Sequence, residues 1–283
     1  MTGRASIDMA RDVEAAKREV NAWAEPAARI GHAAKGLVFT LTGVFVVAAQ
    51  LGIGGDVDGP EAAFVALRGA PLGKLMLATI GIGLLYYAAW ELWRAAADPE
   101  REARGKILVR LEWLIGAVVF GVLSIAAFRV TFARAAARGD DVARTWASWT
   151  MADIPHGAVA LGLVGAVIVV GGAILIRRGW RADFERAMDL TGLAPASWAA
   201  IYAVARFGII ARGAVVATIG LFLVIAAWTH DPSEAIGIEG ALRALGHLRS
   251  APWLLGVVAL GVASYGVYEL LIAWKGRFYI QGA

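Results

Sequence analysis

The sequence contains no cysteine, and this absence removes several classes of chemistry. Without thiols the chain can form no disulfide, thiolate metal site or iron–sulfur cluster, and it has no cysteine nucleophile. Histidine is also scarce, with 4 residues. None of these histidines has metal-ligand spacing, and none lies in the middle of an apolar run, where a haem ligand would be expected. The sequence therefore predicts no metal site and no cofactor.

Recognisable catalytic motifs are missing as well. The sequence has no Gly-Lys-Ser/Thr phosphate loop, no zincin helix and no dinucleotide fingerprint. The segment Val262-Ala263-Ser264-Tyr265-Gly266 resembles a nucleophile elbow only in part, because the first glycine is absent and the segment is predicted to lie in a membrane helix. We therefore expect no enzymatic activity.

Charged residues are few, and apolar residues dominate the chain. Hydrophobic residues make up 59% of the sequence, against roughly 45–50% in soluble domains. Six apolar runs are each close to the ~20 residues that a helix needs to cross a bilayer. The runs are Gly36–Ile53, Leu72–Trp93, Leu111–Phe128, Gly157–Ile176, Ile209–Trp228 and Trp253–Trp274. The predicted fold class is an all-α integral membrane protein with six transmembrane helices.

The basic residues are distributed unevenly between the two sides of these spans. Of the 27 Lys and Arg, 19 fall on the side shared by both termini and 8 on the other side. By the positive-inside rule we expect both termini in the cytoplasm and the protein in the inner (plasma) membrane. This distribution favours lipid headgroups as partners and argues against nucleic acid. Residues 1–27 lack the apolar run of a signal peptide and are predicted to form an amphipathic segment, which rests on the inner leaflet or docks a protein partner.

The spans form an internal repeat of two-helix units. Segment 28–36 matches segment 205–213 at an offset of 177 residues, and segment 83–92 matches segment 261–270 at an offset of 178. The units are predicted as hairpins over 28–97, 107–178 and 205–280, and the second unit has diverged. The outer loops of the first and third units each contain a short apolar-faced segment, Ala62–Leu67 and Gly240–Leu245, expected to rest at the outer interface. The residues that carry the repeat signature are Arg29, Gly31, Gly36, Tyr87, Arg206, Gly208, Gly213 and Tyr265.

This pattern resembles the bacterial membrane family catalogued as domain of unknown function 1206, whose members carry three tandem copies of a two-helix module. The similarity covers about residues 28–280 and is most specific in the third unit. The motifs that carry it there include Ala211-Arg212-Gly213, Asp231-Pro232, Gly266-Val267-Tyr268 and Arg277-Phe278-Tyr279. The resemblance implies the fold and assigns no biochemical role.

Two charge pairs are the most informative polar features of the spans. We expect Lys35 to pair with Glu91 and Arg212 to pair with Glu269, because each cation begins one helix of a unit near the inner side and each glutamate ends the next helix. The aligned positions of the second unit are Gly116 and Leu175, which cannot form such a pair. These residues are either structural ion pairs at the inner interface or a gate or ion site, since ionisable groups near hydrocarbon are costly and often functional.

Two functions remain open from the sequence. Apolar span centres, glycine-rich helix faces and the lack of a catalytic set favour a non-enzymatic membrane protein that binds lipid or associates with a complex. The alternative is a transporter or channel-like protein for a small solute or ion, because many transporters are built from repeats. A polar path along the bundle axis would favour transport, and a sealed apolar centre would favour the first function.

Overall fold

The computed structural model describes residues 26, 28–53, 59–97, 107–133, 139–182, 188, 194–246 and 253–276. Nearly all of these residues are helical, and this part of the chain has no strand beyond an isolated bridge between Met188 and Gly276. Apart from residue 26, the predicted amphipathic segment 1–27 lies outside the described residues. Six helices are long and apolar enough to cross a membrane: Ala28–Gln50 (called the first span here), α3 (Gly73–Ala97), α4 (Ile107–Ala133), α6 (Gly157–Arg181), α7 (Pro195–Thr229) and α9 (Leu254–Lys275). The chain is thus a multi-pass membrane protein of the predicted all-α class.

Shorter helices fill the connection between the two spans of each unit. The two apolar-faced segments predicted in these connections lie in helices α2 (Gly59–Gly69) and α8 (Ile238–Gly246), and a single turn, η2 (Pro232–Glu234), precedes α8; their place at the outer interface stays a prediction. Helix α5 (Gly139–Asp153) connects the two spans of the second unit. All four elements pack against span helices or against each other.

The span helices follow a simple packing order. Helix α4 packs on α3, α7 packs on α6, and the first span packs on α9, so the first helix of each unit lies against the second helix of another unit. Two units also hold together internally, because the first span contacts α3 and α7 contacts α9. The described residues of α4 and α6 form no such extensive contact. The predicted hairpin of the second unit is therefore not confirmed, and the repeat arrangement as a whole stays a prediction.

Glycines at equivalent positions make the helix contacts. A Cβ atom added to Gly36 would lie 2.8 Å from the carbonyl oxygen of Gly266 in α9. A Cβ atom added to Gly213, which aligns with Gly36, would lie 2.8 Å from the carbonyl oxygen of Gly172 in α6. Lipid tails are as apolar as the helix surfaces, so the hydrophobic effect does not drive helices together inside a bilayer. Close backbone approach of this kind joins them instead. Gly121 of α4 meets nothing within 4 Å, which agrees with the looser second unit.

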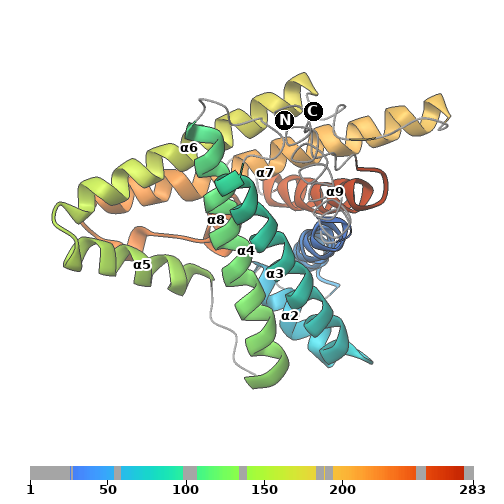
Figure 1. The fold of residues 1–283 in the computed structure, drawn as a ribbon, viewed down its shortest axis with the longest axis horizontal. Helices are drawn as coiled ribbons and strands as arrows, with labels where there is room; N and C mark the ends of the chain where they lie inside the picture. The colour runs from blue at the N-terminus through green and yellow to red at the C-terminus, as the bar shows by residue number, and fades with distance from the viewer. Residues whose placement is uncertain are drawn as a thin grey trace, which may run out of the picture.

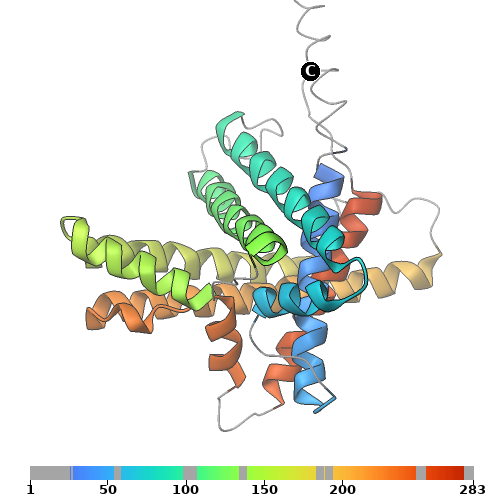
Figure 2. The same ribbon diagram turned by 90° about the horizontal axis from the view of Figure 1, so that it is seen from below.

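The helices are not all aligned along one direction. Figures 1 and 2 show α6 and α7 side by side and antiparallel, and this pair crosses the first span steeply. The main apolar core joins the first span, α3, α4 and α9, with Leu77, Leu84 and Val38 almost completely buried. Helix α6 instead exposes large apolar side chains, including Val159 and Leu163, as expected of a surface that faces lipid.

Candidate functional site

A cluster of ionisable side chains lies inside the spans, where three helices meet. Lys35 is seven residues into the first span, which begins at Ala28, a depth of about 10 Å at 1.5 Å per residue. Glu269 is six residues before the end of α9 at Lys275, or about 9 Å from that end. Both side chains are buried, at 2% and 3% exposure. Charges at this depth are expensive, so each requires a partner within the protein.

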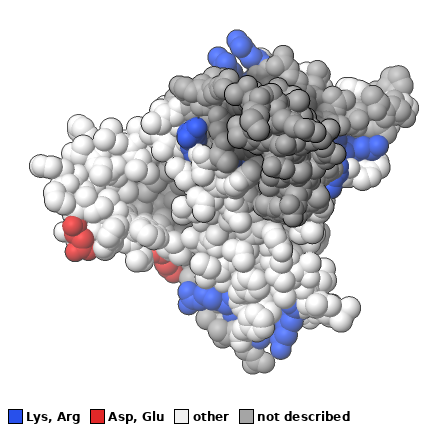
Figure 3. Space-filling view, in the orientation of Figure 1, with Lys and Arg blue, Asp and Glu red and all other residues white. Residues whose placement is uncertain are grey.

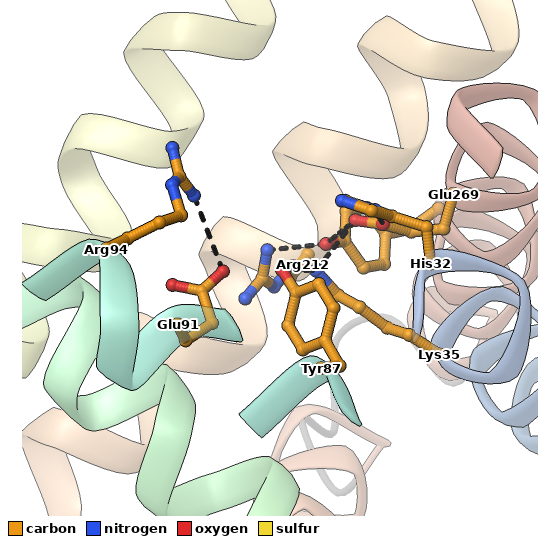
Figure 4. Close-up of polar contacts among 8 residues, drawn as sticks. His32, Lys35, Tyr87, Glu91, Arg94, Arg212 and Glu269 are labelled. Atoms are coloured by element: carbon orange, nitrogen blue, oxygen red, sulfur yellow. Dashed lines mark hydrogen bonds and ion pairs between the residues drawn. The ribbon is translucent and has the colours of Figure 1, made fainter. Parts of the chain in front are cut away.

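Glu269 is the centre of the cluster (Figure 4). Lys35 Nζ lies 2.9 Å from Glu269 Oε1, and His32 Nδ1 lies 2.6 Å from Glu269 Oε2. The hydroxyl of Tyr265, one helical turn earlier on α9, donates a short hydrogen bond to Glu269 Oε1. Both oxygens of this buried carboxylate therefore have partners, which is the condition for keeping a carboxylate inside a protein.

Lys35 is enclosed by aromatic rings as well as by its carboxylate. Its ammonium donates to the hydroxyl of Tyr87 at 2.9 Å. It also lies 4.5 Å from the centre of the Tyr87 ring and 5.1 Å from that of Phe120 in α4. Aromatic faces stabilise a desolvated cation by their negative quadrupole. The first span, α3, α4 and α9 thus all contribute to the surroundings of one ammonium group.

Arg212 and Glu91 flank this centre. Arg212 of α7 donates to the Tyr265 hydroxyl at 2.5 Å, and its guanidinium lies 4.7 Å from the centre of the same ring. Glu91 of α3 pairs with Arg94 at 3.5 Å, and Arg94 in turn lies 4.5 Å from the Trp113 ring. Glu91 lies four residues after Tyr87 on α3, about one helical turn away, so this flank adjoins the centre of the cluster along the same helix.

The structure corrects the predicted choice of partners. Lys35 was predicted to pair with Glu91 of its own unit, but it pairs with Glu269 of the third unit. The reason is the packing order, because the close approach of Gly36 to Gly266 sets the first span against α9 and brings Lys35 to that carboxylate. Arg212 meets Glu269 through the Tyr265 hydroxyl.

Glu91 lies beside the position of the second unit at which the aligned cation is missing. Gly116 aligns with Lys35, and a Cβ atom added to Gly116 would lie 3.5 Å from Glu91 Oε2. Because no lysine or arginine is present at this position of the second unit, Arg94 from the same helix balances Glu91 instead.

The other signature residues take equivalent positions in the first and third units. Gly31 approaches Tyr87 and Gly208 approaches Tyr265, each glycine giving the tyrosine of its own unit room to reach the network. Arg29 donates to the carbonyl oxygens of Ala273 and Trp274 at the end of α9, both at 2.9 Å. Its counterpart in the third unit, Arg206, lies 5.0 Å from the Trp180 ring near the end of α6.

Sequence reasoning missed His32 and Arg94 as members of the network. Spacing could have indicated both, because His32 lies three residues before Lys35 and Arg94 three residues after Glu91, so each pair shares a helix face. Tyrosine and glutamate are likewise four residues apart in both units, as Tyr87 with Glu91 and Tyr265 with Glu269.

The acidic residues in the connections within the units form no metal site among the described residues. On the face drawn in Figure 3 the acidic side chains lie over α5, where Asp141 pairs with Arg144 at 3.7 Å. Glu239 at the start of α8 is buried and pairs with Arg243. Asp231 lies just beyond α7, and hydrogen bonds from the side chain and backbone of Ser233 lower the pKa of its carboxyl group.

One open hollow lies apart from the charge network. It is found between α5 and η2 and is lined by Arg144, Thr145, Ser148, Trp149, Ala152, Asp153, Pro232 and Ser233. The network itself is held by direct contacts among its members, and its Lys35 and Glu269 side chains are almost completely buried.

Comparisons with known proteins place the chain in a family. The sequence model described as Domain of Unknown Function (DUF1206) matches residues 30–98 and 207–276, which correspond to the first and third units. The chain is 31% identical over 259 residues to "Uncharacterized protein YxxB" of Bacillus subtilis (strain 168), covering 90% of this chain and 92% of that protein. No solved structure matches. The spans, the charge network built from the two matched units and this full-length similarity together lead to one conclusion: the chain belongs to the DUF1206 family.

Proposed function

We propose that this protein is a non-enzymatic protein of the bacterial plasma membrane that binds membrane lipid or associates with a larger membrane complex. Both termini lie in the cytoplasm in this proposal, in agreement with the 19 basic residues on their side of the spans. The observation that carries the proposal is the direct pairing of the buried charges in the network. Each carboxylate has a cation as partner, Lys35 for Glu269 and Arg94 for Glu91, and the Lys35 and Glu269 side chains are almost completely buried.

Apolar side chains close the network toward the outer side. The Phe39 ring packs edge-to-face on Phe120 and on Tyr265, with centroid distances of 6.4 and 5.1 Å. Further outward, Val46, Phe64 and Leu77 are buried at 3% exposure or less. Conduction requires sites that water or ions can enter and leave. A layer of packed aromatic and aliphatic side chains supports a structural role for the charges.

Reconstitution into sealed liposomes tests this proposal. Purified protein would be inserted into vesicles that contain an impermeant pH-sensitive dye, and a proton gradient would be imposed with potassium and an ionophore to balance charge. We expect the gradient to decay as slowly as in protein-free vesicles. Faster decay with the wild-type protein that is abolished by Glu269→Gln would contradict the proposal.

Transport is the second candidate, and one observation favours it. His32, Lys35, Arg212 and Glu269 come from three helices and meet inside the spans, and ionisable groups at such depth often serve ion or proton pathways. In this candidate, a rearrangement of the first span against α9 would open the network. The vesicle experiment separates the two functions directly, because only transport predicts a leak that depends on Glu269.

Partners follow from the same proposal. Membrane lipids contact the exposed apolar faces of α6, and the segment 1–27, which the sequence predicts to be amphipathic, docks a protein partner in this proposal. The proposal includes no nucleic acid and no cofactor.

A further inference from the structure

We propose that the adjoining parts of α6 and α7 form a binding site for the headgroup of an anionic phospholipid. The site consists of Arg177, Arg178, Trp180 and Arg181 from the last turns of α6 and of Arg206 from α7. This inference rests on the proposed lipid-binding function and deepens it, because it names a lipid class and a location.

The first argument is the density of basic side chains. Three arginines fall within the last five residues of α6, and all three are exposed. A guanidinium group presents paired donors that match the two oxygens of a phosphodiester. Each basic residue near a charged membrane surface adds attraction to anionic lipid.

The second argument is that the site is assembled from two helices. The guanidinium of Arg206 lies 5.0 Å from the centre of the Trp180 ring. Gly179 holds the helices together here, since a Cβ atom added to it would lie 2.7 Å from the Ile210 side chain and 3.2 Å from the carbonyl oxygen of Arg206. The position of Arg206 relative to α6 is therefore fixed by packing.

The third argument is a contrast with a similar pair elsewhere in the protein. Arg94 lies 4.5 Å from the Trp113 ring, but Trp113 is 4% exposed and Arg94 is balanced by Glu91. Trp180 is 69% exposed. The same combination of arginine and tryptophan is thus internal in one place and presented at the surface in the other.

The depth of the site in the membrane indicates which ligand binds there. Arg181 is the last residue of the apolar span that begins at Gly157, so the site lies at the level where hydrocarbon meets headgroups. Exposed tryptophan is typical of this level, and arginines there contact lipid phosphates. An anionic phospholipid such as phosphatidylglycerol or cardiolipin supplies both the phosphate for the arginines and the apolar chains for the exposed faces of α6.

Native mass spectrometry of the detergent-purified full chain tests the site. Wild-type protein would be mixed with phosphatidylglycerol or with zwitterionic phosphatidylcholine, alongside the Arg177→Gln/Arg181→Gln/Arg206→Gln variant. A matched control removes three cations away from this site, from α3, α4 and the short helix α5, as Lys74→Gln/Arg129→Gln/Arg144→Gln. We expect the wild type and the control to prefer phosphatidylglycerol, and the site variant to lose about tenfold or more in retained phosphatidylglycerol.

Three results would overturn the inference. The site variant could retain phosphatidylglycerol as the wild type does, the control could lose it equally, or excess inorganic phosphate could displace it, which would indicate a site for a soluble anion. If the wild type retains no lipid of either kind, the lipid-binding half of the proposed function fails as well. If it retains lipid and only the site variant is unaffected, the failure is confined to this location.

Fluorescence quenching gives a second measurement that does not depend on removing the arginines. Phosphatidylglycerol brominated on its acyl chains quenches tryptophan on contact. We expect stronger quenching of the wild-type protein by brominated phosphatidylglycerol than by brominated phosphatidylcholine, and loss of this difference in Trp180→Phe. A difference that survives in Trp180→Phe would place the preferred lipid elsewhere.

Discussion

Lys35 in the first span and Glu269 in the last span form a buried ion pair, with 2.9 Å between Nζ and Oε1. The two residues are 234 positions apart in the sequence. Their pairing brings the first and the last span of the chain into contact. His32 and Tyr265 form hydrogen bonds to the same carboxylate. The contact between the first span and α9 therefore depends on four side chains that lose their water together.

The two glutamates of the network should differ in their contribution to stability. Glu269 has Lys35, His32 and Tyr265 as partners, whereas Glu91 is paired at 3.5 Å with Arg94, a side chain that is 18% exposed. We expect Glu269→Gln to cost ~3–5 kcal/mol, as for a broken buried pair, and Glu91→Gln to cost less. Thermal unfolding in mild detergent measures both. An equal or larger loss for Glu91→Gln would show that Glu269 is not the centre of the network.

Glycine substitutions test the helix contacts. A methyl group at Gly36 or Gly213 would meet a facing backbone carbonyl at 2.8 Å, so alanine should force the helices apart. We expect Gly36→Ala and Gly213→Ala each to cost about 1–3 kcal/mol, as in overpacked cores. Gly121→Ala is the matched control, because nothing lies within 4 Å of its added Cβ. A loss for Gly121→Ala as large as for Gly36→Ala would contradict the packing described.

Cysteine labelling tests the orientation of the spans. The chain has no cysteine of its own, so single introduced cysteines report one position each. Asp141→Cys and Ser233→Cys, both at exposed positions on the outer loops, should react with an impermeant thiol reagent in intact cells. Arg181→Cys and Ser197→Cys should react only after lysis. The reverse pattern would invert the predicted topology.

The lowered pKa of the Asp231 carboxyl group predicts that its contribution to stability depends on pH. Hydrogen bonds from Ser233 lower its pKa in the folded protein, so its stabilising contribution is present above the unfolded value of about 3.9 and is lost as pH falls through the lower folded value. We expect Asp231→Ala to reduce thermal stability at neutral pH and to make less difference under strongly acidic conditions. A difference between variant and wild type that does not change with pH would exclude this source of stability.

The sequence was sufficient for the fold class and for four charged residues of the network, Lys35, Glu91, Arg212 and Glu269. Long apolar runs form helices in lipid, so the start of α6 at Gly157 was predicted to the residue, whereas the helix continues to Arg181, past the predicted end at Ile176. The repeat offset also identified Gly36 and Gly213, Tyr87 and Tyr265 as equivalents before their contacts were known.

Partner choice could not be predicted, because it depends on which helix faces which. Lys35 could reach a glutamate on α3 or on α9, and only the Gly36–Gly266 approach decides between them. The Glu91–Arg94 pair was overlooked for a related reason, since the missing cation at Gly116 matters only once α4 is known to lie against α3.

A double-mutant cycle on Lys35 tests the account most directly. Unfolding free energies would be compared for Lys35→Met, Glu269→Gln and Glu91→Gln, and for the two double variants that combine Lys35→Met with each glutamine. We predict that Lys35→Met/Glu269→Gln is less destabilised than the sum of its single variants by at least ~1 kcal/mol, while the combination with Glu91→Gln is closer to additive. Additive losses for Lys35 with Glu269, or a larger coupling with Glu91, would contradict the closure of the first span on α9.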